Sequence, residues 1–198
     1  MTLKTGDKAP AFDLPTDGGG TLTLGSLKGK KVVLYFYPKD STPGCTTEAN
    51  DFTDRIKDFE KAGCVVVGAS KDSVKRHDNF KAKQAIAFPL LSDEDGTLCN
   101  DYGVWVQKKL YGREYMGIER ATFLIDAQGR IARAWRNVKV ADHAAAKNAD
   151  VGWRDARHAR EEDAPAELRT LEILRPFLNA HAAGDFTHWS EQRQTAIR

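Results

Sequence analysis

The distribution of apolar residues along the chain predicts alternating strands and helices. Continuous apolar runs at 32–37 and 64–68 are typical of strands buried on both faces of a sheet. Between these runs, apolar residues recur every three or four positions and predict one helix that ends near Gly63. They are Ala49, Phe52, Ile56 and Phe59.

The pattern continues with shorter elements in the middle of the chain. Residues 73–85 form a second predicted helix, with Val74 and Phe80 directed inward. A short strand at 88–91 and a short helix at 97–102 follow, and the Gly-, Lys- and Tyr-rich stretch 107–117 is predicted to be a loop.

Two pairs of alternating segments predict antiparallel hairpins. Residues 11–14 and 21–24 flank three consecutive glycines, and 121–126 and 130–136 flank the turn Asp126-Ala127-Gln128-Gly129. Together these elements predict an α/β protein with a central mixed sheet flanked by helices and an N-terminal hairpin, compatible with a thioredoxin-like fold.

The C-terminal region is less regular. Residues 144–164 have few large apolar side chains and are predicted to be an insertion before a final amphipathic helix at about 165–178. We therefore expect one thioredoxin-like domain over residues 1–184 and a polar tail at 185–198.

Length and charge restrict the function classes. The chain has 198 residues, which fits one domain with one sizeable core. Its formal charge of +2 comes from 30 basic and 28 acidic side chains, which is too small to predict a nucleic-acid or membrane partner. It contains neither an apolar run of membrane-spanning length nor an N-terminal secretory signal, so we expect a cytoplasmic location.

No cofactor or metal site is predicted. The three cysteines contain no CxxC pair and no zinc-type cluster, and in a reducing compartment they remain free thiols. The consecutive glycines lack the spacing of a nucleotide-binding loop. The histidines lack metal-ligand spacing and are predicted to be surface or cap residues. They are His77, His143, His158, His181 and His188.

The strongest local signal for chemistry is the segment 38–45, Pro-Lys-Asp-Ser-Thr-Pro-Gly-Cys, between a buried strand and a helix. Thr42 is the predicted N-cap and Pro43 the first helical residue, which places Cys45 in the first turn. Free backbone N–H groups and the positive end of the helix dipole there favour a thiolate, the nucleophilic form of cysteine. A structural cysteine that only fills the cap region is the alternative.

The pattern Pro38-x-x-x-Thr42-x-x-Cys45 resembles the active-site signature of the peroxiredoxins. The wider stretch 35–46 is similar to the bacterioferritin comigratory protein, or peroxiredoxin Q, subfamily, and the similarity extends over about residues 3–142. Further matching stretches are Leu91-Ser92-Asp93, Tyr102-Gly103-Val104-Trp105 and residues 117–126.

The resemblance implies a thiol-dependent peroxidase that reduces hydrogen peroxide and organic hydroperoxides. Cys45 is the implied peroxidatic residue, and Thr42 aligns the peroxide. Arg120 supplies a permanent positive charge that favours the thiolate, and Pro38 shields it from water. Taken without the resemblance, Arg120 reads as a surface ion-pair partner of Glu119 or Asp126.

The chain departs from the subfamily at the resolving cysteine. The two positions where relatives carry it are occupied by Asn50 and Lys81. Cys64 and Cys99 are predicted to be structural, because the first opens a buried strand and the second lies on a short helix. We therefore expect a one-cysteine mechanism in which thioredoxin, glutaredoxin or glutathione reduces the sulfenic acid, in a monomer or weak homodimer.

Other function classes are weaker. A peroxide sensor or a thioredoxin-fold binding protein would oxidise Cys45 with little turnover. The absence of CxxC argues against a disulfide oxidoreductase, and no histidine is placed beside Cys45 for a Cys–His hydrolase. A basic and aromatic patch at 105–115, with Lys108, Lys109 and Arg113, is a solvated loop, a rim over the peroxide site or a docking face for the reductant.

Overall fold

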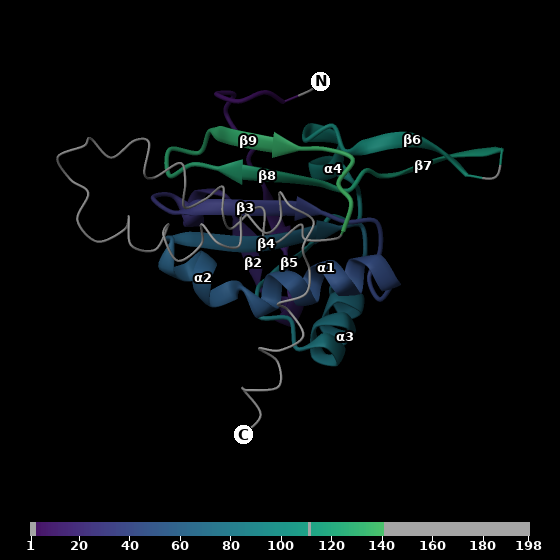
Figure 1. Cartoon of the computed structure of the whole chain (residues 1–198), viewed down its shortest axis with the longest axis horizontal. Helices are drawn as coiled ribbons and strands as arrows, with labels where there is room; N and C mark the ends of the chain where they lie inside the picture. Colours follow the sequence, from purple (N-terminus) through teal and green to yellow (C-terminus); the bar gives the residue numbers. More distant parts are fainter. Residues whose placement is uncertain (1–2, 111, 141–198) are drawn as a thin grey trace, which may run out of the picture. The chain divides into compact units, whose positions relative to one another are not determined.

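The structure is a computed structural model that describes residues 3–110 and 112–140 (Figure 1). The strands are β1 (Asp13–Pro15), β2 (Thr21–Thr23), β3 (Lys31–Phe36), β4 (Cys64–Ser70), β5 (Leu90–Ser92), β6 (Trp105–Leu110), β7 (Arg113–Ile118), β8 (Ala121–Ile125) and β9 (Ile131–Trp135). The helices are η1 (Asp17–Gly19), η2 (Gly25–Leu27), α1 (Pro43–Asp54), α2 (Ile56–Lys61), α3 (Val74–Gln84) and α4 (Thr97–Asp101). The predicted insertion, final helix and polar tail lie outside the described residues.

The predicted mixed sheet is confirmed. Five strands run in the order β5-β4-β3-β8-β9. The contacts of β3 with β4 and of β4 with β5 are parallel, whereas β8 is antiparallel to β3 and to β9. The N-terminal hairpin is also confirmed, since β1 pairs with β2 antiparallel. Because β3 is the middle strand, the loop that follows its carboxyl end has two strands of the sheet on either side of it.

The sheet separates two apolar layers. On one face, Phe52 and Phe59 of α1 and α2 and Phe80 of α3 pack against Val33 and Tyr35 of β3. On the other face, Leu98 of α4 belongs to a separate cluster with the alternate residues of β3. Figure 1 shows α1, α2 and α3 together below the strands. Strand β3 is therefore buried on both faces, as its unbroken apolar run predicts.

The prediction of a single helix between β3 and β4 is wrong. The structure has two helices, α1 and α2, and Arg55 between them leaves helical geometry at φ −105° and ψ 7°. Phe52, before the break, and Phe59, after it, are both fully buried. Apolar spacing did not reveal the interruption because both helices bury the same stripe of residues.

The loop predicted at 107–117 is also wrong. Strands β6 and β7 pair residue for residue from Trp105 with Ile118 to Leu110 with Arg113, and Gly112 has φ +78° at the turn. Most of β7 is exposed, so this ribbon lacks the apolar alternation of a half-buried strand. In Figure 1 the hairpin extends away from the five-stranded sheet.

Within residues 3–110 and 112–140, no helix combines the length and apolar character needed to span a bilayer.

Candidate active site

Cys45 lies where the sequence predicts it, in the first turn of α1. Pro43 begins the helix, and the backbone N–H of Thr46 donates to the carbonyl of Thr42 at 2.9 Å. Cys45 is only 2% exposed and packs in the same apolar layer as Tyr35 and Phe52. The thiol thus combines a helix N-terminus with a site largely shielded from water.

Thr42 has the extended backbone of an N-cap residue, but its side chain does not cap the helix. Its hydroxyl instead donates to the carbonyl of Lys39 at 3.0 Å. The N-cap position predicted for Thr42 is confirmed, although its hydroxyl bonds to the preceding turn and not to the helix. Pro38, in the same loop, is exposed.

Arg120 reaches Cys45 from a distant part of the chain. It lies between β7 and β8, where the N–H of Glu119 donates to Val104 and the carbonyl of Arg120 accepts from Val138. Nη2 donates to Cys45 Sγ at 3.2 Å. A Cβ on Gly44 would lie 3.6 Å from the same Nη2, so the guanidinium packs closely over the start of α1. The ion pairs considered for Arg120 with Glu119 or Asp126 are not found among the described residues.

Glu48 is a buried partner of Arg120 that the sequence reasoning missed. Its side chain is 0% exposed, and Arg120 Nη1 forms an ion pair with Oε2. Because Glu48 follows Cys45 by three residues on a helix, both side chains project toward the same guanidinium. That spacing was visible in the sequence and could have identified Glu48.

The charge of Arg120 is secured by its surroundings. Burial lowers the pKa of Arg120, but the negative charges of Glu48 and Cys45 outweigh this effect and leave it raised. The guanidinium is therefore a permanent cation that contacts the sulfur with one nitrogen and a carboxylate with the other.

Tyr35 borders the same charged cluster from β3. Its side chain is 1% exposed and stacks on Phe52 with ring centroids 4.7 Å apart. Burial raises the pKa of Tyr35 well above its usual value, and the charges of Glu48 and Cys45 raise it further. A neutral phenol therefore lies beneath the thiol.

Neither remaining cysteine lies beside Cys45 in this fold. Cys64 pairs with Lys31 at the amino end of β3, about 16 Å along the strand from the carboxyl end that leads to Cys45. Cys99 is fully buried in the apolar layer on the opposite face of the sheet. A disulfide requires Cα atoms within about 7 Å, so both thiols fit their predicted structural role.

The surface position predicted for His77 is wrong. Its side chain is 0% exposed and lies on the inner face of α3. Nδ1 lies 2.8 Å from Asp40 Oδ2, and Nε2 lies 3.0 Å from the carbonyl oxygen of Leu91. Its position three residues from both Val74 and Phe80 indicated this inner face, but a polar side chain was assumed to be solvated.

A surface hollow borders the loop that leads to Cys45. Its volume is about 380 Å³, and it combines apolar side chains with three lysines. The lining residues are Pro38, Lys39, Lys71, Asp72, Trp105, Lys108, Tyr115, Met116, Gly117 and Ile118.

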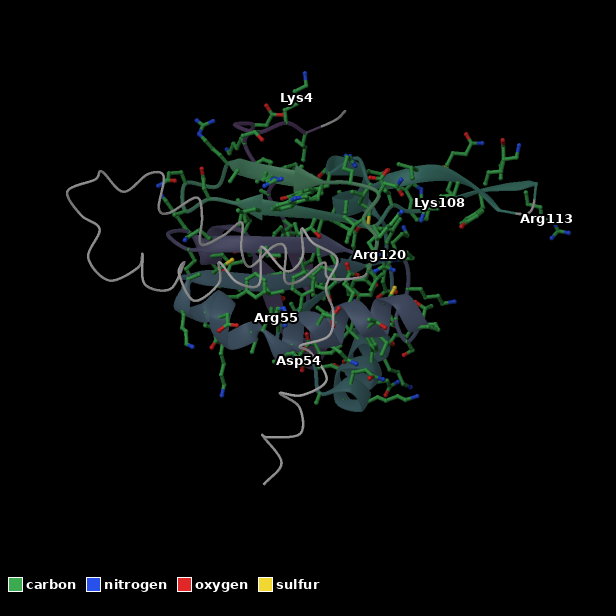
Figure 2. The ribbon with its side chains drawn as sticks, in the orientation of Figure 1. Lys4, Asp54, Arg55, Lys108, Arg113 and Arg120 are labelled. Atoms are coloured by element: carbon green, nitrogen blue, oxygen red, sulfur yellow. The ribbon has the colours of Figure 1, made fainter. Side chains whose placement is uncertain are left out.

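The basic patch predicted at 105–115 divides between this hollow and the hairpin end. Figure 2 shows Lys108 near Arg120 at the base of the hairpin and Arg113 at its far end. Burial lowers the pKa of Lys108, and the positive charge of Arg120 lowers it further. Lys108 therefore belongs to the surroundings of the active site, whereas Arg113 does not.

The described residues contain no cluster of His, Cys, Asp and Glu suited to hold a metal ion. All three cysteines are free thiols. The site instead places a buried cysteine at a helix N-terminus beside a fixed cation, an arrangement that suits nucleophilic chemistry at sulfur.

Comparison with known proteins agrees with this geometry. The model of the AhpC/TSA family matches residues 5–134. Peroxiredoxin Bcp of Xanthomonas campestris is 54% identical over 138 residues, which cover 69% of this chain and 86% of that protein. Peroxiredoxin Bcp of Bacillus subtilis is 52% identical over 145 residues, which cover 73% and 92%.

A solved structure extends the agreement to the fold. The bacterioferritin comigratory protein of X. campestris, studied for alkyl peroxide reduction, superposes with a TM-score of 0.70 at 50% identity. The match covers 72% of this chain and 91% of that one. The chain belongs to the AhpC/TSA family and, within it, to the Bcp or peroxiredoxin Q group of thiol-dependent peroxidases.

Proposed function

We propose that Cys45 is the peroxidatic cysteine of this peroxiredoxin and that an external thiol completes each cycle. The contact of Arg120 Nη2 with Cys45 Sγ at 3.2 Å carries the proposal. A guanidinium at this distance stabilises a thiolate, and it also faces the oxygen on which negative charge develops during attack.

In the first step the thiolate attacks one peroxide oxygen and the O–O bond breaks. The sulfur gains that oxygen as a sulfenic acid, and the other oxygen leaves as water or an alcohol after taking up a proton. The sulfur is thereby oxidised by two electrons and the peroxide is reduced. Arg120 stabilises the developing oxyanion, and Glu48 holds the guanidinium in place.

Thr42 aligns the peroxide as a hydrogen-bond acceptor. A hydroxyl has one proton, and that proton is used in the bond to the Lys39 carbonyl. The Thr42 oxygen therefore accepts a hydrogen bond from the peroxide O–H, while the donors are Arg120 and the backbone N–H groups of Gly44 and Cys45. Pro38 restricts solvent at the border of the hollow.

The second half of the cycle requires two molecules of thiol, or one dithiol. A thiol attacks the sulfenic sulfur and releases water, which leaves a mixed disulfide on Cys45. A second thiol then displaces Cys45 and is oxidised with the first to a disulfide. The fold supports an external thiol because Cys64 lies at the far end of β4 and Cys99 lies across the sheet.

Organic hydroperoxides and the reductant share an approach through the hollow beside Pro38. Apolar contact with Trp105 and Met116 suits an alkyl group, and Lys39, Lys71 and Lys108 suit an anionic thiol or an acidic protein surface. We expect thioredoxin, glutaredoxin or glutathione in this role, in a cytoplasm that keeps thiols reduced.

The test is peroxide consumption with hydrogen peroxide or an alkyl hydroperoxide, with each of the three thiol systems supplied separately. Cys45→Ser should abolish turnover, because an alcohol cannot replace the thiolate, and Cys64→Ser is the matched control that should retain it. Turnover by Cys45→Ser would overturn the proposal. Stoichiometric oxidation without turnover in any thiol system would identify a sensor instead of an enzyme.

A further inference from the structure

A buried polar network anchors the loop that precedes Cys45. Asp40 is 3% exposed and makes three polar contacts, two through its carboxylate and one through its backbone N–H. Its Oδ1 accepts from the Tyr37 hydroxyl at 2.8 Å, its Oδ2 faces His77 Nδ1 at 2.8 Å, and its backbone N–H donates to Asp72 Oδ2 at 2.7 Å. The loop is therefore held simultaneously by β3, by α3 and by the turn after β4.

His77 connects this network to β5 through both ring nitrogens. Nδ1 faces Asp40 Oδ2 and the Tyr37 hydroxyl, and Nε2 faces the carbonyl of Leu91. The carboxylate of Asp72, which accepts from Asp40, also forms an ion pair of its own, with Arg76 Nε 2.6 Å from Asp72 Oδ1.

The residue after Asp40 has a strained backbone. Ser41 has φ +60°, in the left-handed region that residues other than glycine rarely occupy. Ser41 is itself exposed, so packing of its own side chain does not impose this conformation. It lies between the anchored Asp40 and Thr42, which begins the turn of Cys45.

We propose that His77, through its hydrogen-bonded contact with Asp40, is a positioning residue that maintains the Ser41 turn and so fixes Thr42 and Cys45 for attack on peroxide. The inference rests on the proposed function of Cys45. Without this contact, Ser41 relaxes toward negative φ, and the segment between Asp40 and α1 shifts. A displacement of about 1 Å at reacting groups can cost about 100-fold in rate.

The test is the single-turnover rate of Cys45 oxidation by hydrogen peroxide in the full chain, measured where near-UV circular dichroism shows each variant folded. His77→Gln keeps a donor toward Leu91 but loses the one toward Asp40, and should slow oxidation by about 10- to 100-fold. His77→Asn keeps a donor toward Asp40 and should lose less. If His77→Gln does not fold, Asp40→Asn removes the carboxylate that faces His77 with almost no change of shape.

Ser41→Gly provides the decisive second change. Glycine adopts positive φ without strain, so the turn no longer depends on the contact between His77 and Asp40. Combined with His77→Gln, it should restore oxidation to within about threefold of the wild-type rate. Lys81→Ala is the matched control on the same helix, since Lys81 pairs with Asp17 at 2.7 Å and does not touch the loop. It should leave the rate within about twofold of wild type.

Three outcomes would overturn the inference. They are an unchanged rate in His77→Gln, a slow rate that Ser41→Gly does not restore, and an equal loss in Lys81→Ala. Failure of the wild-type protein to oxidise at Cys45 would instead refute the proposed function, so the two failures are distinguishable.

Discussion

Arg120→Met removes the cation beside the sulfur while leaving a side chain of similar length. At the observed 3.2 Å between Nη2 and Sγ, a pair of unit charges interacts by about 5 kcal/mol at an effective dielectric constant of about 20. The carboxylate of Glu48 on the same guanidinium offsets part of this. The remaining interaction energy is comparable with the loss of about 2.7–4 kcal/mol that follows removal of one preorganised donor from an oxyanion site.

The expected result is a loss of about 10²–10³ in the rate constant for oxidation of Cys45 by hydrogen peroxide. Stopped-flow measurement of a single turnover isolates this step from reduction by thiols. The free energy of unfolding should also fall, by about 3–5 kcal/mol, because the buried carboxylate of Glu48 loses its counterion.

Two further variants separate catalysis from stability. Glu48→Gln combined with Arg120→Met removes the carboxylate that has lost its contact with Arg120, so stability should recover while oxidation stays slow. Arg136→Met removes a nearby arginine that pairs with Glu119 at 3.3 Å, and should leave oxidation within about twofold of wild type. An unchanged rate in folded Arg120→Met, or recovery of the rate together with stability in the double variant, would refute the reasoning.

Three other changes test the roles assigned to the remaining groups. Cys64→Ser with Cys99→Ser should leave dithiothreitol-supported turnover nearly intact, and a large loss in folded protein would mean that one of them resolves Cys45. Burial raises the pKa of Cys99, and Asp93 raises it further, so above about pH 8.5 the thiol ionises only in the unfolded chain. Stability should therefore fall as pH rises, and Cys99→Ala should lessen that slope by up to about 1.4 kcal/mol per pH unit in urea titrations; equal slopes would contradict this. Gly68→Ala should cost about 1–3 kcal/mol in urea unfolding, because a Cβ would lie 2.9 Å from the Tyr35 hydroxyl oxygen, and unchanged stability would contradict that packing.

The parts of the fold that the sequence predicts are those in which burial and periodicity agree. The apolar runs of β3 and β4 identify them as interior strands, and the 126–129 turn identifies the β8–β9 hairpin. The β6–β7 ribbon was missed because it lies outside the main sheet, and its exposed, charged residues carry no apolar alternation. Gly112, which has a positive φ at the turn, was the available signal.

The site was predictable only where its residues are adjacent in sequence. Cys45 and the N-terminus of α1 follow from the Pro-Gly-Cys segment, whereas Arg120 is 75 residues away and was assigned by resemblance alone. Glu48 and His77 were missed, although helical spacing placed both on inner faces. Polar residues at such positions are usually solvated, and only the tertiary structure shows which of them have a buried partner.

The central claim is that Cys45 is oxidised by peroxide and is not resolved within the chain. The most direct measurement is intact and peptide mass spectrometry of the reduced protein after one equivalent of hydrogen peroxide, with and without a sulfenic-acid trap. We predict the gain of one trappable oxygen on Cys45. Loss of two hydrogens, with Cys45 linked to Cys64 or Cys99 in the peptide map, would contradict the account.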